Sequence, residues 1–99
     1  MIGEKQLITQ QYKKTSIAIL QENLSALRAK ANISQEKLAT FIGISRQTYY
    51  GIETGQKEMA WTIFIALIFY FYSNYLTKEM LYELKIYPIE LVMNINGEL

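Results

Sequence analysis

The chain of 99 residues contains no cysteine, no histidine and no aspartate, so its nine acidic residues are all glutamates. These absences exclude thiol nucleophiles, disulfides, imidazole-based catalytic dyads and metal sites built on Cys or His. The five glycines form neither GxxxxGK[ST] nor GxGxxG, the motifs that hold nucleotide phosphates. No spacing among the glutamates indicates a catalytic carboxylate pair. We therefore expect no enzyme, no bound metal and no cofactor.

Proline and charge are also scarce, with one proline and 19% charged residues against 51% hydrophobic residues. This composition is typical of one folded domain and not of a disordered chain. The first residues lack a secretion signal, which favours a cytoplasmic location. Residues 59–72, MAWTIFIALIFYFY, would span about 21 Å as a helix, short of the ~30 Å hydrocarbon core of a bilayer. A buried helix is therefore favoured over a membrane anchor.

The net charge of +1 is unevenly distributed along the chain. Residues 13–57 carry a net charge of +4, whereas the remainder carries −3. A basic middle with acidic flanks indicates nucleic acid bound to one face, although an ordinary solvated surface has the same pattern.

Apolar spacing and capping residues predict a mainly α fold of five helices. The expected helices cover residues 16–30 with Thr15 or Ser16 as the N-cap, a segment from Ser34 to Gly43, residues 46–54 closed by Gly55, residues 61–73, and a short segment capped by Thr77. Residues 89–95 alternate as a strand does, and residues 7–11 are either a strand paired with them or a disordered lead. The expected division is an N-terminal lead over 1–15, a domain over 16–84 and a C-terminal extension over 85–99.

Two short helices joined by a tight glycine turn form a helix-turn-helix, whose second helix can enter the major groove of DNA. From Ser34 to Gly55 the sequence is SQEKLATFIGISRQTYYGIETG. It closely resembles the phage-repressor helix-turn-helix family, called Xre-like or lambda-repressor-like. The family pattern S-Q-x-x-L-A-x-x-x-G-[IV]-S-x-x-x-[IV]-x-x-I-E-x-G is met at every fixed position except Tyr49, where the family prefers a β-branched aliphatic residue. The resemblance covers Asn23 to about Leu81 and implies a five-helix lambda-repressor-like domain.

The resemblance implies which residues contact double-stranded DNA. They are Gln35, Ser45, Arg46, Gln47, Tyr50, Thr54 and Lys57. Gln35 matches the glutamine that holds a backbone phosphate, while Ser45, Arg46 and Gln47 open the helix that contacts base edges. Tyr50 would touch a thymine methyl group or a phosphate. Thr54 and Lys57 would meet phosphates, although a solvated loop charge is an equal interpretation of Lys57.

Two further positions bear on this interpretation. Arg28 matches the arginine that pairs with the glutamate of the I-E-x-G motif, here Glu53, so a structural ion pair is favoured over a phosphate contact. Gly51 departs from the family, which often has a long polar side chain there. Either a base contact is missing or other atoms must approach the backbone at Gly51, since glycine costs a helix ~1 kcal/mol relative to alanine.

The apolar segment after residue 60 predicts a surface that another segment or a second subunit covers. If one face of the helix over 61–73 is core, its other faces expose apolar side chains, and a large apolar patch usually marks an interface. We expect a homodimer interface formed by Phe69, Tyr70, Tyr72, Ile89, Leu91 and Met93.

Together these features predict a sequence-specific DNA-binding transcriptional regulator, a dimeric repressor that inserts residues 46–54 into the major groove. Two alternatives remain: an antitoxin that binds a toxin and represses its own promoter, and a protein-interaction or membrane-associated module with weakened DNA recognition. Gly51 and the apolar helix favour the module. The presence of Gln35, Arg46 and Gln47 favours DNA binding, because the fold requires none of these side chains.

Overall fold

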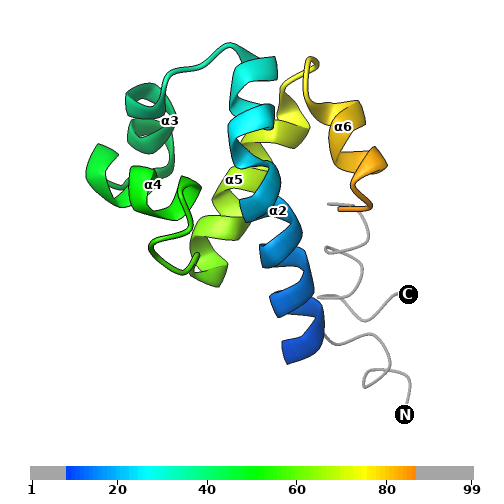
Figure 1. Ribbon diagram of the computed structural model, residues 1–99. Coiled ribbons are helices and arrows are strands. Elements are labelled where there is room, and N and C mark those ends of the chain that lie inside the picture. Colours follow the sequence, from blue (N-terminus) through cyan, green and yellow to red (C-terminus); the bar gives the residue numbers. More distant parts are fainter. Residues whose placement is uncertain (1–8, 87–99) are drawn as a thin grey trace.

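The computed structural model describes residues 9–86, which form five helices and no strand (Figure 1). In chain order they are α2 (Gln10–Ala31), α3 (Gln35–Ile42), α4 (Arg46–Glu53), α5 (Trp61–Ser73) and α6 (Lys78–Glu83). The expected mainly α class with five helices is confirmed. The expected strand over residues 89–95 lies outside the described residues.

The first helix begins earlier than the sequence predicted. Its N-cap is Thr9, whose hydroxyl accepts a hydrogen bond from the backbone N–H of Tyr12 at 3.0 Å, so Thr15 and Ser16 are not caps. The added turns are stabilised from α5, since Tyr12 packs edge-on against Trp61 and the Lys13 ammonium lies 5.3 Å from the centroid of that ring. The strand alternative for residues 7–11 is therefore wrong at residues 10 and 11, and α2 crosses the expected boundary at residue 15.

Both helices of the helix-turn-helix begin where the sequence predicted and α3 ends at the expected Gly43, whereas α4 ends one residue early, at Glu53 with Thr54 as its C-cap. The hydroxyls of Ser34 and Ser45 accept hydrogen bonds from the backbone N–H groups of Lys37 and Thr48, at 3.1 and 3.0 Å. Gly43 ends α3 with φ +85°, a left-handed conformation that a side chain would strain. These local signals set the turn that orients α4 against α3.

The core lies between α2 and α5, with α3 and α4 on one side and α6 on the other (Figure 1). Its fully buried side chains include Leu20, Leu24, Leu27, Leu38, Tyr49, Ile52, Phe64, Leu67, Phe71 and Leu81. Ala39 is also buried in α3, the helix that packs against α4, and a larger residue would separate the two helices. The core thus fixes α4 from its inner face and leaves its outer face to solvent.

The outer faces of α5 are covered more fully than the sequence predicted. Phe69 is 66% exposed, but Tyr70 packs edge-on against Phe41 with ring centroids 5.1 Å apart, and Tyr72 packs similarly against Tyr82 at 6.2 Å. Tyr70 and Tyr72 are therefore half-buried within the chain, and only part of each side chain is left for the expected interface. Ile89, Leu91 and Met93 lie outside the described residues.

Thr77 does not cap α6 with its side chain. Its hydroxyl is fully buried and donates to the carbonyl oxygen of Phe71 at 2.7 Å. This bond ties the start of α6 to the end of α5, because a buried hydroxyl needs a partner. The residue therefore joins two helices.

Candidate nucleic-acid interface

The outer face of α4 carries four of the predicted DNA contacts. Arg46, Gln47, Tyr50 and Thr54 follow one another at helical spacing, and all four side chains are exposed. Arg46, Gln47 and Tyr50 line one shallow surface pocket. The side chains of Arg46 and Gln47 make no hydrogen bond or ion pair within residues 9–86. Side chains with unused donors on a projecting helix are suited to contacting base edges.

Ser45 has a different role from the others. Its Oγ accepts from the Thr48 backbone N–H at 3.0 Å and donates to Thr48 Oγ1 at 2.9 Å. These two bonds occupy the hydroxyl in capping α4. The geometry therefore supports Ser45 as a residue that orients α4, with any DNA contact an additional role.

A cluster of polar side chains under α4 holds its C-terminal end. Arg28 Nε donates to Glu53 Oε1 at 3.0 Å, and the Arg28 guanidinium also donates to Oε2 at 3.1 Å. Tyr49 Oη donates to Oε1 at 2.6 Å, and Gln35 Nε2 donates to Oε2 at 3.2 Å. The guanidinium also reaches the Ile33 carbonyl oxygen at 3.3 Å. The predicted ion pair is thus formed, and it links α2, α3 and α4.

The charges of this cluster stabilise one another. Burial alone would raise the pKa of Glu53, but the hydrogen bonds from Arg28, Tyr49 and Gln35 outweigh it and lower that pKa below its ordinary value. The hydrogen bond to Glu53 raises the pKa of Arg28. Burial, together with the bond to the carboxylate, raises the pKa of Tyr49, so its hydroxyl stays protonated as a donor. At neutral pH the pair is fully ionised.

Gln35 lies between this cluster and the surface. It is half-buried at the start of α3, and one hydrogen of its amide is used on Glu53. A glutamine amide has a second hydrogen, which leaves one donor for a phosphate. The structure thus places Gln35 where it joins the interior cluster to the predicted DNA face.

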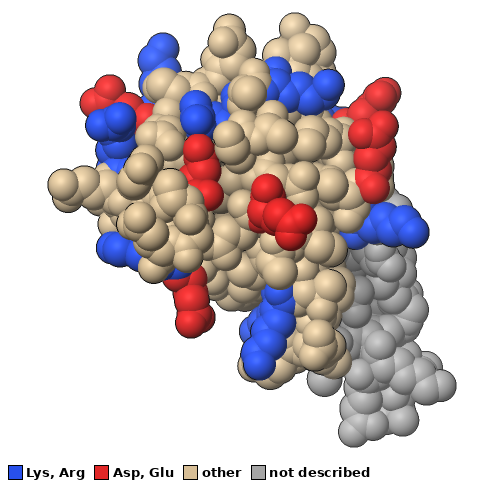
Figure 2. Space-filling model, viewed as in Figure 1, with Lys and Arg blue, Asp and Glu red and all other residues tan. Residues whose placement is uncertain are grey.

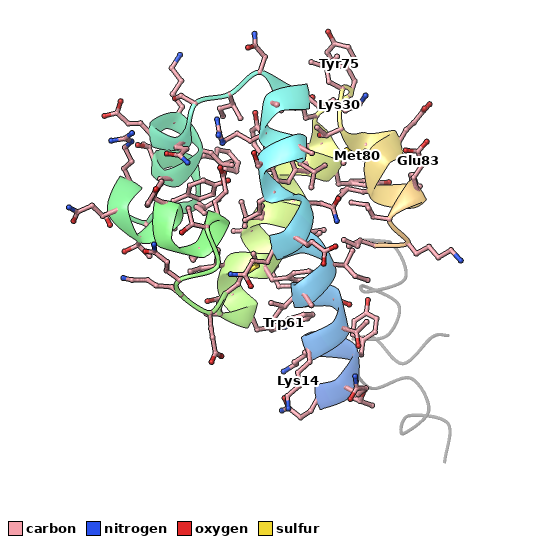
Figure 3. All side chains as sticks on the ribbon, viewed as in Figure 1. Lys14, Lys30, Trp61, Tyr75, Met80 and Glu83 are labelled. Carbon is pink, nitrogen blue, oxygen red and sulfur yellow. The ribbon has the colours of Figure 1, made fainter. Side chains whose placement is uncertain are left out.

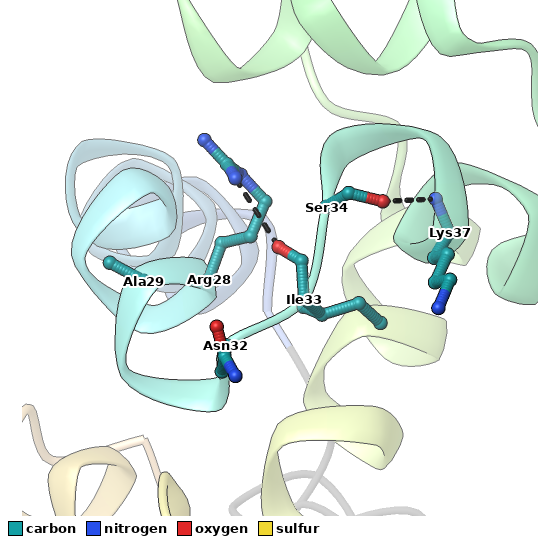
Figure 4. A pocket seen from close by; sticks show the side chains of 6 residues that line it. All are labelled: Arg28, Ala29, Asn32, Ile33, Ser34 and Lys37. Carbon is teal, nitrogen blue, oxygen red and sulfur yellow. Dashed lines mark hydrogen bonds between the residues drawn. The ribbon is translucent and has the colours of Figure 1, made fainter.

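Two shallow depressions flank this region. Figure 4 shows the first, between the end of α2 and the start of α3, lined by Arg28, Ala29, Asn32, Ile33, Ser34 and Lys37. The second extends to the start of α4 and is lined by Arg28, Ser34, Gln35, Glu36 and Arg46. Arg28 lines both depressions, but its guanidinium is committed to Glu53, which favours its structural role over a phosphate contact.

The charge distribution agrees with a DNA face on α3 and α4. Glu53 is neutralised by Arg28, and the remaining charges from residue 34 to residue 57 are Lys37, Arg46 and Lys57 against Glu36 alone. Figure 2 shows acidic side chains on the edge formed by α6, and also among the Lys and Arg side chains on the side of α3 and α4. This small basic excess is compatible with a polyanion on the side of α3 and α4.

Gly51 and Lys57 are brought together by the loop that follows α4. A Cβ atom built on Gly51 would lie 3.0 Å from Cγ and 3.1 Å from Cδ of Lys57. The departure from the family at Gly51 therefore has a physical reason, because the aliphatic part of Lys57 occupies the space of the absent side chain. Of the two alternatives that the sequence left open, a close approach of other atoms is confirmed.

Two contributors to this region were missed by the sequence analysis. Tyr49 was noted only as a departure from the family pattern, although its spacing of four from Glu53 on one helix was a signal for a contact. Gln21 donates from α2 to the carbonyl oxygens of Ile52 and Lys57, both at 2.8 Å. No local signal marks Gln21, because its partners belong to a distant loop.

Comparison with protein-family models matches residues 24–59 to the model described as helix-turn-helix. The match runs from the middle of α2 to the loop before α5. Residues 24–59 therefore belong to the Xre, lambda-repressor-like helix-turn-helix family, a family of DNA-binding transcription regulators that is generally not enzymatic. No curated protein and no solved structure matched the chain. In residues 9–86, no helix combines the length and apolar character needed to cross a membrane.

Proposed function

We propose that this protein is a sequence-specific repressor that binds double-stranded DNA as a homodimer, with α4 in the major groove. One observation carries the proposal: Arg46 and Gln47 stand exposed at the start of a capped, firmly packed helix and use none of their donors within residues 9–86. Their positions match those that contact base edges in the family.

The chemistry of the two side chains suggests the bases they select. Arg46 can donate two parallel hydrogen bonds to O6 and N7 of guanine, and Gln47 can form a bidentate pair with adenine. Tyr50, 49% exposed one turn further on, offers its ring to a thymine methyl group or its hydroxyl to a phosphate. Gln35, Thr54 and Lys57 would set the register of the domain through the DNA backbone.

The dimer is the second part of the proposal. A helix-turn-helix dimer binds two half-sites about one helical turn apart, so a two-fold operator requires a two-fold protein. Phe69 supports an interface on α5, since it is a large apolar side chain that the described residues leave mostly exposed. The other proposed interface residues are Tyr70, Tyr72, Ile89, Leu91 and Met93.

An antitoxin or protein-interaction module is the second candidate. It is favoured by the exposed apolar side chains outside α4, among them Phe41 and Tyr75. Tyr75 projects from the turn between α5 and α6 (Figure 3). A toxin could occupy this surface while α4 stays on DNA, so an antitoxin would still select a specific duplex. A module with weakened DNA recognition would select none, and this outcome separates it from a repressor.

The test is selection from random duplex DNA with the full chain. The proposal predicts an enriched motif with two half-sites, and affinity that falls steeply between ~50 and ~200 mM salt through counterion release. Arg46→Ala should relax preference at one position of each half-site, with a loss of ~1 to 3 kcal/mol of discrimination. Lys30→Ala, at the end of α2 away from α4 (Figure 3), is the control. Enrichment of no motif would refute specific regulation.

A further inference from the structure

The loop after α4 is held in place by hydrogen bonds to both the backbone N–H and the carbonyl oxygen of Lys57. The backbone N–H of Lys57 donates to the Gly51 carbonyl oxygen at 3.0 Å, and the Lys57 carbonyl oxygen accepts from Gln21 Nε2 at 2.8 Å. The N–H of Gln56 also donates to the Gly51 oxygen, at 2.8 Å. A lysine at the surface of an irregular loop therefore has a fixed backbone, although its side chain is exposed.

Gln21 connects this loop to the recognition helix. The same Nε2 that bonds Lys57 also donates to the carbonyl oxygen of Ile52, at 2.8 Å. A glutamine amide nitrogen has two hydrogens, so Gln21 uses both on the backbone that follows from α4. Ile52 is buried and α2 is the longest of the described helices, so these two bonds fix the backbone at residue 57 relative to the core.

The side chain of Lys57 is directed by the gap at Gly51. Its Cγ, Cδ and Cε lie 3.0, 3.1 and 3.5 Å from the place of a Cβ on residue 51. On a helix of 3.6 residues per turn, position 51 is next to the exposed stripe of Gln47 and Thr54. The aliphatic part of Lys57 therefore lies along the edge of the base-reading face, in place of the polar side chain that the family has there.

We propose that Lys57 is a prepositioned contact for a DNA phosphate beside the major groove, and that Gln21 and Gly51 are positioning residues that hold it there. This inference rests on the proposed DNA binding and adds how the chain replaces the side chain lost at residue 51. An ordinary solvated loop charge needs neither a fixed backbone nor a slot for its methylene groups. A lysine that is ordered before binding loses less side-chain entropy on meeting a phosphate.

The experiment measures the affinity of the full chain for its selected duplex at several salt concentrations. Lys57→Met keeps the methylene groups over Gly51 and removes only the charge. It should weaken binding about two- to fivefold, as for one exposed ion pair, and reduce the slope of log K against log salt by about 0.9. Lys30→Met, at the end of α2 away from α4, should leave both quantities unchanged.

Gln21 is tested by a double-mutant cycle. Gln21→Met, of similar size but without donors, should weaken binding in the wild type but have no further effect in Lys57→Met, since it acts through Lys57. A merely structural role would give the same loss in both backgrounds. If Gln21→Met fails to fold, Gly51→Ala serves in its place, because alanine favours a helix while its Cβ displaces the Lys57 side chain.

The outcomes separate this inference from the function on which it rests. If the wild type binds a specific duplex but Lys57→Met keeps the wild-type salt slope, the phosphate contact is refuted and DNA recognition stands. If the losses of Gln21→Met and Lys57→Met simply multiply, the positioning role is refuted. If the wild type binds no duplex, both proposals fall together.

Discussion

Replacing Arg28 with alanine is the most direct test of what holds the recognition helix. The substitution removes both hydrogen bonds that the guanidinium donates to Glu53 and the one to the Ile33 carbonyl oxygen. Glu53 then remains as a carboxylate with only 8% of its side chain exposed, and its remaining donors are Tyr49 and Gln35. An ionised group with little access to water and half of its donors removed destabilises the folded state.

The magnitude follows from the burial of the two partners. Removing one partner of a deeply buried ion pair costs ~3 to 5 kcal/mol. The Arg28 side chain is 23% exposed, so water already screens the pair, and two neutral donors still bind Glu53 after the substitution. We therefore expect Arg28→Ala to lower the free energy of unfolding by about 2 to 3 kcal/mol. For a domain of this size that corresponds to a fall in Tm of roughly 10 to 20 °C.

Thermal and urea unfolding at neutral pH measure this loss. A double-mutant cycle with Glu53→Gln should show that much of the Arg28→Ala loss disappears once residue 53 is neutral. Lys30→Ala on the same helix is the matched control and should leave Tm unchanged, because Lys30 is exposed. The motif selected from random DNA should also stay the same. Equal melting temperatures for wild type and Arg28→Ala would remove the ion pair from the account of stability.

Three further predictions concern the same region. Tyr49→Phe removes only the 2.6 Å hydrogen bond to Glu53 and should cost about 1 to 2 kcal/mol in unfolding experiments, whereas no loss would show that the hydroxyl contributes nothing. Because the folded state lowers the pKa of Glu53, its contribution is complete above the unfolded value of ~4.3 and is lost as the pH falls through the lower native pKa. The stability advantage of wild type over Glu53→Gln should shrink correspondingly in acid titrations, and a constant difference would contradict this. Gly51→Ala should raise the free energy of unfolding by up to ~1 kcal/mol through helix propensity, and with it Tm, yet weaken DNA binding by displacing Lys57. A variant that is more stable and binds DNA as tightly as wild type would contradict the second effect.

The sequence predicted those parts of the fold that local chemistry determines. The caps at Ser34 and Ser45 and the left-handed Gly43 are set by neighbouring residues, so both helices begin where expected and α3 also ends where expected. The start of α2 was missed because Thr9 and Thr15 are comparable caps by local criteria. The contacts of Tyr12 and Lys13 with Trp61, which stabilise the earlier turns, exist only after α5 packs against α2.

The same distinction applies to the candidate site. The pairing of Arg28 with Glu53 followed from the family resemblance, and the structure confirms the contact. The hydroxyl of Tyr49 and the amide of Gln21 add bonds that the family pattern does not contain. Tertiary packing determines which atoms these two side chains bond, so their residue types alone did not indicate the bonds. Gly51 was recognised as a departure, but only the approach of Lys57 explains it.

The inner face of α4 stabilises the fold, and its outer face carries the proposed DNA contacts. A helix of eight residues is not stable alone, so α4 depends on its cap at Ser45, its buried side chains and the bonds at Glu53. None of these involves the side chains of Arg46 or Gln47, which make no hydrogen bond within residues 9–86. If α4 contacts DNA as we propose, substitutions at these two positions should change the preferred DNA sequence without changing the unfolding free energy. Gly51 is the exception, because it belongs to the helix and also holds the side chain of Lys57. At that one position a gain in stability opposes the contact that we propose with DNA.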